Sequence, residues 1–510
     1  MLLTRSIFTP IFFVILLIFS QAAAANPWQD LARADLAFAH EQIEMNHPGA
    51  IDPDDAHVRQ WLDDGYAHAL AQLPNVSSLS DYRLILNAFF AGFRDPHVGI
   101  SLGVSQPDLQ WPQFVVAGRY GKVMVVGSSM TTPAVGAELV ACDGVPVDQL
   151  LTKRVFAFGA NPAVEASFDR EVRQLFFYSR NSFFARLQTC RFTNKGAAFD
   201  VELEWKDLTP QAWRMFENAD GEVFGSPSLS EPMDGIYWLA VPSFSADGNN
   251  KMAMENLFRK INQMQNTMAE SKALVIDVRG NRGGTDALVE RLTYLLFDKD
   301  TLRKAGESKQ APIEIDWRAS AGNLADAQTW LDPANSRYHA NQALIRGVID
   351  GLKSAFDQKR DYFRQTVEAE TFSEDPSTLP YWYHQGDPST KQCPAFVPAV
   401  PIKAKIFVLM DGACVSACLD FLDNLKLFAG IKYLGLATDA DTQYLDTRSM
   451  ELPSQLGKIS FPMKVYRTRA RKPGQVYEPD VKFTGLQRDQ KDLRDWALGV
   501  VSKSVGGALQ

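Results

Sequence analysis

The sequence predicts an α/β protein whose core is a mainly parallel sheet covered by helices, with a helical region and a β-rich region ahead of it. Three patterns lead to this fold class. Residues 27–102 place apolar side chains at intervals of three and four, which is typical of helices. Residues 107–205 change to short strands separated by turns. From Asp234 onward strands alternate with helices, the order that produces a parallel sheet with helices on its faces.

The helical region is predicted to span residues 26–104. It contains "WQDLARADLAFAHEQIEM" and then "SLSDYRLILNAFFAGF", which begins at a serine suited to cap a helix. Pro96 and Gly99 end the helical periodicity in "FRDPHVGISLG". We therefore expect His97 to lie on a turn that leads into a short strand.

The β-rich region is predicted to span residues 105–206. Its segment "GAELVACDGVPVDQLL" is typical of a strand, an Asp-Gly turn, a second strand and a helix. In this order the segment resembles the PDZ module, whose sheet edge and helix hold an extended peptide. The resemblance implies a PDZ-like domain that binds a peptide chain or regulates access to the site.

The core, residues 207–510, begins with the strand "GIYWLAVPSF", a helix, the strand "ALVIDV" and the helix "TDALVERLTYLLF". An insertion at about 298–394 interrupts it with helices of its own and an aromatic patch at 381–384. Its side chains Trp317, Trp330 and Trp382 could form a wall or lid. The core resumes with the strand "AKIFVLM", a helix over 417–429 and two short strands.

Residues 1–25 are predicted to be a secretory signal peptide. Arg5 is their only charged residue, the run from Ile7 to Phe19 is apolar, and cleavage is expected near Ala24 or Ala25. An N-terminal membrane anchor is the alternative, but the apolar run is short for a span of about 20 residues. We therefore expect an exported protein, periplasmic or extracellular, without membrane contact after cleavage.

Composition and charge narrow the function further. With 46% hydrophobic and 22% charged residues over 510 positions, the chain has a globular composition and room for about two to four domains. Loss of Arg5 would change the formal charge from -8 to -9, which disfavours nucleic acid as a partner. The chain has no CxxC or HExxH motif, and His40 and His47 lie about two helical turns apart, so we expect no metal and no cofactor.

The stretch "DGACVSACLD", residues 411–420, follows a predicted buried strand and places Ser416 at or just before the next helix. Ligands bind at the carboxyl ends of strands in open α/β sheets, and a helix N-terminus favours the negative charge of an oxyanion. Serine is also among the commonest helix caps. From these residues alone Ser416 is either a nucleophile or a cap.

A second predicted buried strand ends in "VIDVRGNRGG", a turn that contains Gly283 and Gly284. Because glycine lacks a Cβ, backbone N–H groups here can approach a ligand, as an oxyanion hole requires. An ordinary tight turn between a strand and a helix is the alternative.

Taken in order after a PDZ-like stretch, "GIYWLAVPSF", "ALVIDVRGNRGG" and "IFVLMDGACVSACLDFLDNLK" resemble the tail-specific, or C-terminal processing, family of serine peptidases. The resemblance covers most of residues 85–485 and implies a ClpP/crotonase-like core. It implies Ser416 as the nucleophile, Gly283 or Gly284 as the oxyanion glycine, and the amide of Ala417 as a second donor.

The chain departs from this family at the base. Many members use a lysine within a Thr-x-Gly-Lys-Gly segment after the serine, whereas "GLATDADTQ" places Asp441 there. Lys426, Lys432 and Lys458 all lie outside that motif. The sequence is therefore nearer the tricorn-like members, which lack the lysine.

A histidine is then the expected base, because the pKa of imidazole lies near neutrality. His97 is the first choice, since "DPHV" resembles the turn that supplies the histidine in tricorn-like relatives. The alternatives are that His97 is a turn residue satisfied by Asp95, or that His384 is the base.

The third, orienting residue is less constrained by the sequence. Glu478, in "GQVYEPDVKF", is the first choice, and Asp480 and Asp441 are the alternatives. Carboxylates beside a proline turn are more often solvated or structural.

Five cysteines in an exported chain allow one or two disulfides and leave at least one thiol. Cys142 and Cys190 are one possible pair. Cys414 is expected to pack or to pair, with Cys393 as a possible partner, and Cys418 to pack on the buried helix face. A thiol nucleophile at either position is disfavoured by an oxidising compartment.

These patterns together predict an exported serine endopeptidase or carboxy-terminal processing protease with a peptide or protein substrate. A catalytically inactive relative of the same fold, which binds a peptide or another ligand, is the alternative. An enzyme that acts on a different acyl substrate is the third.

Overall fold

The computed structural model describes residues 26–103, 109–159, 161–220, 225–307, 312–332, 335, 342–367 and 399–506. The predicted signal peptide, the aromatic patch with Trp382 and His384, and Cys393 lie outside these residues. Within the described ranges, no helix combines the length and the apolar character that a membrane crossing requires.

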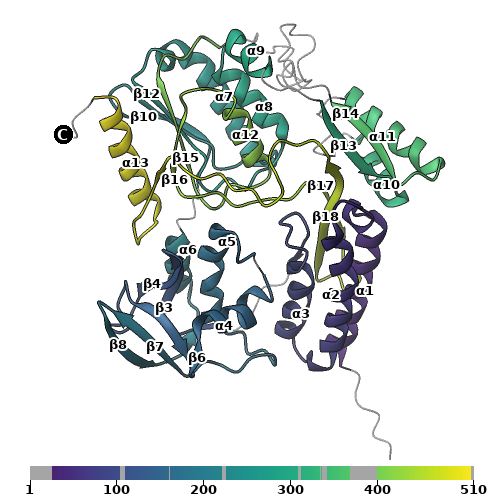
Figure 1. The fold of residues 1–510 in the computed structure, drawn as a ribbon, viewed down its shortest axis with the longest axis vertical. Coiled ribbons are helices and arrows are strands. Elements are labelled where there is room, and N and C mark those ends of the chain that lie inside the picture. The colour runs from purple at the N-terminus through teal and green to yellow at the C-terminus, as the bar shows by residue number, and fades with distance from the viewer. Residues whose placement is uncertain are drawn as a thin grey trace, which may run out of the picture.

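The predicted helical segments form three helices at the start of the described chain, α1 (Pro27–Asn46), α2 (Ala56–Gln72) and α3 (Leu79–Ala91). Ser78 caps α3 by accepting a hydrogen bond from the N–H of Asp81, as the sequence predicts. The apolar faces of the helices share a core with the strand residues Ile459, Phe461 and Val465. Figure 1 shows these helices, in purple, beside the strand that contains these three residues, β18 (Gly457–Tyr466).

The β-rich region folds into an antiparallel sheet with short helices. Cys142 and Cys190, which pair in register across two of its strands, form a disulfide, as one of the predicted pairings had it. The sheet contains β3 (Phe114–Arg119), β4 (Lys122–Ser128), β5 (Glu138–Cys142), β6 (Val145–Pro146), β7 (Thr189–Asn194) and β8 (Ala197–Glu202), and the helices are α4 (Val147–Leu151) and α5 (Glu165–Glu171). Helix α6 (Pro210–Asp220) follows the predicted boundary at residue 206 but packs on this sheet through Ala212 and Phe216.

The core sheet is mainly parallel, which confirms the predicted arrangement. Its strands lie in the order β10 (Ser228–Met233), β11 (Ile236–Ala240), β12 (Ala273–Asp277), β15 (Lys405–Met410), β16 (Lys432–Gly435) and β19 (Val481–Lys482). The pair β10 and β11 is antiparallel and the others are parallel. Strands β12 and β15 are direct neighbours, so the turns that follow them meet at one edge of the sheet.

Helices cover both faces of this sheet (Figure 1). One face packs against α7 (Gly248–Ala269), α8 (Asp286–Leu296) and α12 (Ala417–Leu425), whose apolar residues share the largest core. The opposite face packs against α13 (Gln490–Ser504) through Ala497 and Val501. Burial on both sides explains why these strands are continuous apolar runs rather than alternating ones.

A second, antiparallel sheet connects distant parts of the chain. Strand β18 (Gly457–Tyr466) pairs with β1 (Gly99–Leu102), with β17 (Tyr444–Glu451) and with β13 (Ile313–Arg318), which in turn pairs with β14 (Tyr362–Val367). The predicted insertion thus supplies two strands of a shared sheet, besides α9 (Lys299–Glu307), α10 (Ala321–Thr329) and α11 (Gln342–Asp357). Trp317 and Trp330, considered for a wall or lid, are instead buried together in a small core beside α11.

Candidate active site

Ser416 occupies the residue before α12, at the end of the bend that follows β15. Its backbone has φ 58° and ψ -130°, a conformation that L-residues rarely adopt. Such a residue costs about 1–3 kcal/mol and persists only where its surroundings enforce it. The Ser416 side chain makes no capping hydrogen bond, so the interpretation as an ordinary helix cap is wrong.

The Gly-Gly turn after β12 lies directly against Ser416. A Cβ built on Gly283 would lie 2.8 Å from the Ser416 Cβ and 2.9 Å from the Ala417 nitrogen, and Gly283 has φ 88°. Both the space and the backbone angle therefore require glycine at this position. The structure thus brings together the two stretches that the sequence singled out separately.

The backbone N–H groups around this contact differ in their availability. Gly283 N–H donates to Asn281 Oδ1 at 2.9 Å, whereas Gly284 N–H and Ala417 N–H donate no hydrogen bond among the described residues. Asn281 is buried, and its Nδ2 donates to Val241 O, which fixes the turn. Of the three predicted donors, Gly284 and Ala417 therefore have a free N–H, and Gly283 has one that is already used.

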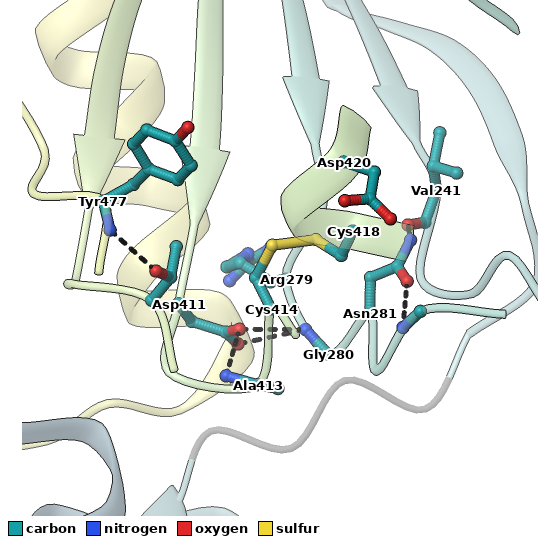
Figure 2. Close-up of a disulfide and its surroundings, with 12 residues drawn as sticks. Val241, Arg279, Gly280, Asn281, Asp411, Ala413, Cys414, Cys418, Asp420 and Tyr477 are labelled. Carbon is teal, nitrogen blue, oxygen red and sulfur yellow. Dashed lines mark hydrogen bonds between the residues drawn. A yellow bond between two sulfur atoms is a disulfide. The ribbon is translucent and has the colours of Figure 1, made fainter. Parts of the chain in front are cut away.

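Asp411 ties the two turns to each other. Its carboxylate accepts hydrogen bonds from Gly280 N–H, at 3.1 and 3.2 Å, and from Ala413 N–H, at 3.0 Å (Figure 2). Burial raises the pKa of Asp411 above its usual range, and these two donors offset part of that effect. The carboxylate therefore holds the start of the bend before Ser416 against the start of the glycine turn.

His97 lies on a turn between α3 and β1, as predicted. Its backbone N–H and its Nδ1 both contact Asp95 Oδ1, at 2.8 and 3.2 Å. Burial lowers the pKa of His97, but the hydrogen bond and charge of Asp95 outweigh it, so that the pKa lies above its usual value. His97 Nε2 is buried and has no hydrogen-bond partner among the described residues.

The second sheet explains how the His97 turn reaches the core. Strands β1 and β17 pair with opposite edges of β18, and the segment before β17 follows the end of β16. Thr442 in this segment donates its hydroxyl to Asp95 Oδ2 at 2.8 Å. Asp441 lies close enough to raise the pKa of His97 further. The His97 turn is therefore anchored to the carboxyl edge of the parallel sheet.

A cluster of ion pairs connects this segment to α12. Arg469 and Arg471 both pair with Asp441 and with Asp420, and Asp420 lies in the first turn of the helix that Ser416 precedes. The N–H of Asp420 in turn donates to Ser416 O at 3.2 Å. Asp441, an alternative for the third residue, is thus engaged with two guanidinium groups.

The other two carboxylates considered for the third role lie elsewhere. Glu478 is exposed, beside Tyr477, whose backbone N–H donates to the Thr438 hydroxyl. Asp480 accepts a hydrogen bond from Tyr433 N–H at 2.7 Å, which stabilises the edge of the core sheet. In the structure, Asp95 is the carboxylate that contacts the His97 ring. From the sequence, Asp95 was predicted only as a hydrogen-bond partner of a turn histidine, not as a third catalytic residue.

Two of the three lysines outside the family motif, Lys426 and Lys458, have structural partners. Lys426 lies 3.7 Å from the ring centroid of Tyr433, and Lys458 pairs with Glu451 at 2.9 Å. No three His, Cys, Asp or Glu side chains of the described chain are grouped as a metal site would require.

The cysteines beside Ser416 are paired with each other. Cys414 and Cys418 form a disulfide, so the expected partner Cys393 for Cys414 and the unpaired packing role for Cys418 are both corrected. Cys414 precedes α12, so it is the bend before the helix that brings Cys414 beside Cys418, a contact that the sequence did not predict. As a disulfide, neither cysteine is a rival nucleophile.

A cavity opens beside the site, between the β-rich region and the carboxyl ends of the core strands. Its lining combines Arg119, Asp169 and Arg170 of the β-rich region with Gly280, Asp411, Gly412, Ala413 and Arg488 of the core. Arg488 pairs with Asp169 at 2.6 Å across this boundary. The β-rich region therefore forms one wall beside the turns that surround Ser416.

Comparisons with known proteins bear on the fold and on the family of the core. No curated protein sequence matches the chain. Among solved structures, mature CPAF aligns over 94% of this chain and 97% of its own, at 16% identity and with a TM-score of 0.58. CPAF complexed with lactacystin aligns over 94% of this chain and 98% of its own, at 15% identity and with a TM-score of 0.58. These two likenesses show a shared fold. The photosystem II D1 C-terminal processing protease aligns less well, with a TM-score of 0.34 at 11% identity over 89% of this chain and 92% of its own.

A protein-family model matches the core in particular. The matched residues, 236–483, are just under half of the chain and contain Ser416, Gly283 and Gly284, but not His97. The family described is peptidase family S41, in agreement with the resemblance to the C-terminal processing peptidases. The core of this chain is therefore similar to peptidase family S41, and the match supports a serine-type peptidase.

Proposed function

We propose that this protein is an exported serine peptidase, an endopeptidase or carboxy-terminal processing protease, with Ser416 as its nucleophile. The observation that carries the proposal is the conformation of Ser416. The residue has a rare backbone geometry, its hydroxyl caps no helix, and it lies against a glycine that has no space for a side chain. Strained, uncapped residues of this kind cluster at active sites.

In the proposed mechanism His97 is the general base. Asp95 holds Nδ1, which fixes the proton on Nδ1 and leaves the Nε2 lone pair free to accept the Ser416 proton. Ser416 Oγ attacks the peptide carbonyl carbon, the protonated His97 then donates to the leaving amine, and an acyl-enzyme remains. A water activated by the same Nε2 hydrolyses it.

The negative charge that develops on the carbonyl oxygen needs donors. Gly284 N–H and Ala417 N–H are the proposed pair, because neither is used within the described structure. The N-terminus of α12 adds a favourable dipole at the same place. Gly283 then allows the glycine turn to approach Ser416 closely, because it has no side chain, but it donates no hydrogen bond to the oxyanion.

For the third residue we propose Asp95, with Glu478 as the alternative from the sequence. Asp95 contacts the His97 ring directly and lies buried, which strengthens its effect on the imidazole. Glu478 would have to act on a water or on substrate, because it is exposed.

The substrate class proposed is a peptide or protein. The PDZ-like reading of the β-rich region supports it, and so does the cavity that this region forms beside the Ser416 turn. An extended chain held by the β-rich region would then lie across the carboxyl edge of the core sheet.

A fluorophosphonate probe tests the proposal, because it reacts with activated serine hydroxyls. We expect the wild type to be labelled on Ser416 and the Ser416→Ala variant to remain unlabelled. Ser504, which lies at the end of α13 away from the two turns, offers a matched control, and Ser504→Ala should be labelled at the wild-type rate. Folded wild type without label would contradict the proposed function.

The missing family lysine favours a second candidate, a catalytically inactive relative that binds a peptide or other ligand. It predicts peptide binding that is unchanged in Ser416→Ala together with no labelling of the wild type. Panels of peptide and ester substrates separate the proposed peptidase from an enzyme for another acyl group.

Export is proposed from the sequence of residues 1–25, and two disulfides in the described chain support an oxidising compartment. The mass of the mature protein tests this. A chain that begins near Ala25 or Asn26 is expected, and an intact Met1 on the secreted protein would contradict signal cleavage.

A further inference from the structure

We propose that the Cys414–Cys418 disulfide positions Ser416 for catalysis, an inference that rests on the proposed role of Ser416 as nucleophile. The two cysteines lie two residues before and two residues after the serine, with Cα atoms 5.3 Å apart. Figure 2 shows the bond joining the bend after β15 to the first turn of α12. Ser416 is the central residue of the loop that this bond closes.

The backbone within this loop has few hydrogen bonds of its own. Cys414 N–H donates to Asp411 O and Cys418 N–H to Val415 O, both at 3.2 Å. Between them, the N–H groups of Val415, Ser416 and Ala417 donate no hydrogen bond to any described residue. The disulfide thus spans three residues whose N–H groups are unpaired among the described residues, while the carbonyl groups of Val415 and Ser416 accept hydrogen bonds from α12.

Those three residues include the two groups that the mechanism needs in place, the Ser416 hydroxyl and the Ala417 N–H. Their unpaired N–H groups and the rare φ of Ser416 both favour relaxation to another conformation. A covalent link between the flanking residues restricts that relaxation. Leaving the N–H of Ala417 free for substrate is then compatible with a fixed turn.

The link is anchored in the protein core. Cys414 and Cys418 are fully buried, and they belong to the same apolar cluster as Leu419, Phe421 and Val408. On the other side, Gly283 lies so close to Ser416 that it has no space for a side chain. Ser416 is therefore held between a rigid buried bond and the glycine turn.

The other disulfide provides a matched control. Cys142 and Cys190 are register partners in neighbouring strands of the β-rich sheet, where ladder hydrogen bonds already hold the backbone. Its loss should reduce stability without changing the geometry around Ser416.

The first test compares two double variants by their rates of fluorophosphonate labelling. For Cys414→Ala/Cys418→Ala we expect the maximal labelling rate to fall about 10²-fold, the effect of a misplacement of about 1 Å, while the probe concentration at half-maximal rate stays unchanged. Cys142→Ala/Cys190→Ala should stay within about threefold of the wild type, a change of under 1 kcal/mol in the barrier. Equal rates for the two folded double variants would overturn the inference.

A second test needs no variant. It tests the role of the disulfide even if Cys414→Ala/Cys418→Ala does not fold. Trypsin cleaves after Lys405 and Lys426, so one peptide carries Ser416 and both cysteines. Partial reduction with dithiothreitol converts the disulfide to two thiols while the reagent becomes a cyclic disulfide. After labelling, the thiols are blocked with N-ethylmaleimide and the peptides are quantified.

We expect the label to be concentrated on peptide in which the disulfide is intact, by about 10²-fold over the blocked dithiol form at short labelling times. The same labelled fraction on both forms would overturn the inference. A wild type that takes no label on this peptide in either form would instead overturn the proposed function. The two failures are thus distinguished in one experiment.

Discussion

The Ser416 turn, residues 411–416, and the His97 turn, residues 95–98, are held in opposite ways. The His97 turn satisfies its own polar groups, since Asp95 accepts from the backbone and the ring and Val98 N–H donates to Asp95 O. Its Nε2 is the atom left without a partner among the described residues. The Ser416 turn leaves the N–H groups of Val415 and Ser416 without a partner among the described residues, and besides the hydrogen bonds of Asp411 it relies on a disulfide and a glycine contact.

The difference follows from what each turn has to do in the proposed reaction. A base has to present one atom in one tautomer, so its other groups are best occupied. A nucleophile with an oxyanion hole has to present a hydroxyl and unoccupied N–H donors together, so hydrogen bonds from these donors cannot hold it. Covalent and steric restraint then replaces them.

The largest expected effect on this comparison comes from His97→Ala. Removal of the free Nε2 should lower the labelling rate by about 10²–10⁴-fold, the usual contribution of general acid-base catalysis. His68→Ala, at an exposed position of α2, is the control and should label normally. A His97→Ala rate within about threefold of wild type would exclude His97 as the base.

Gly283→Ala tests the steric restraint on the other turn. The new Cβ would meet the Ser416 Cβ at 2.8 Å, so labelling should fall by about 10²-fold as the hydroxyl is displaced. Gly474 has a similar φ, 73° against 88°, but open space around its Cβ. Gly474→Ala should therefore lose stability by about 1–2 kcal/mol without losing labelling. Thermal unfolding and labelling of both variants separate strain from displacement.

Asp95→Asn tests how the base is oriented. In the wild type the pKa of His97 lies above its usual value, so the labelling rate should fall on the acid side around a pH above about 6.5. Without the Asp95 charge the pKa drops, and this acid limb should move to lower pH while the plateau rate falls about tenfold. An unmoved acid limb would assign the titration to another group.

The same shift predicts a pH dependence of stability. Because the folded-state pKa of His97 is raised, protonation stabilises the fold at pH values below about 6.5, and this contribution is lost as pH rises through the folded pKa. Chemical unfolding should be measured for wild type and Asp95→Asn from pH 5 to 9. We expect this His97-linked loss of unfolding free energy with rising pH in the wild type only.

Glu478→Gln is expected to have the smallest effect. If Asp95 orients His97, the exposed Glu478 carboxylate contributes little, and labelling should stay within about threefold of wild type. A larger loss of labelling rate for Glu478→Gln than for Asp95→Asn would instead support Glu478 as the third catalytic residue.

The sequence was sufficient for the elements whose pattern is local. The apolar runs that became β12 and β15 predicted buried parallel strands, and the polar break after each predicted the two turns at their ends. The turn position of His97 followed from Pro96 and Gly99 in the same way. These predictions depend on neighbours in the chain.

The features that sequence missed depend on contacts between distant residues. The pairing of β1 with β18 joins residues more than 350 positions apart, and it carries the His97 turn to the core. The use of Gly283 N–H by Asn281 and the burial of Trp317 depend on three-dimensional packing. The Cys414–Cys418 pairing depends on the rare conformation of the bend at Ser416, because Cys414 lies before α12 and not on its face.

The most direct test of the account is a crystal structure of the fluorophosphonate adduct. It should place the phosphorus on Ser416 Oγ, the His97 Nε2 within about 2.6–3.2 Å of that oxygen, and the phosphonyl oxygen on Gly284 N–H and Ala417 N–H. An adduct on another residue, or a His97 ring turned away with a different side chain on Ser416 Oγ, would contradict it.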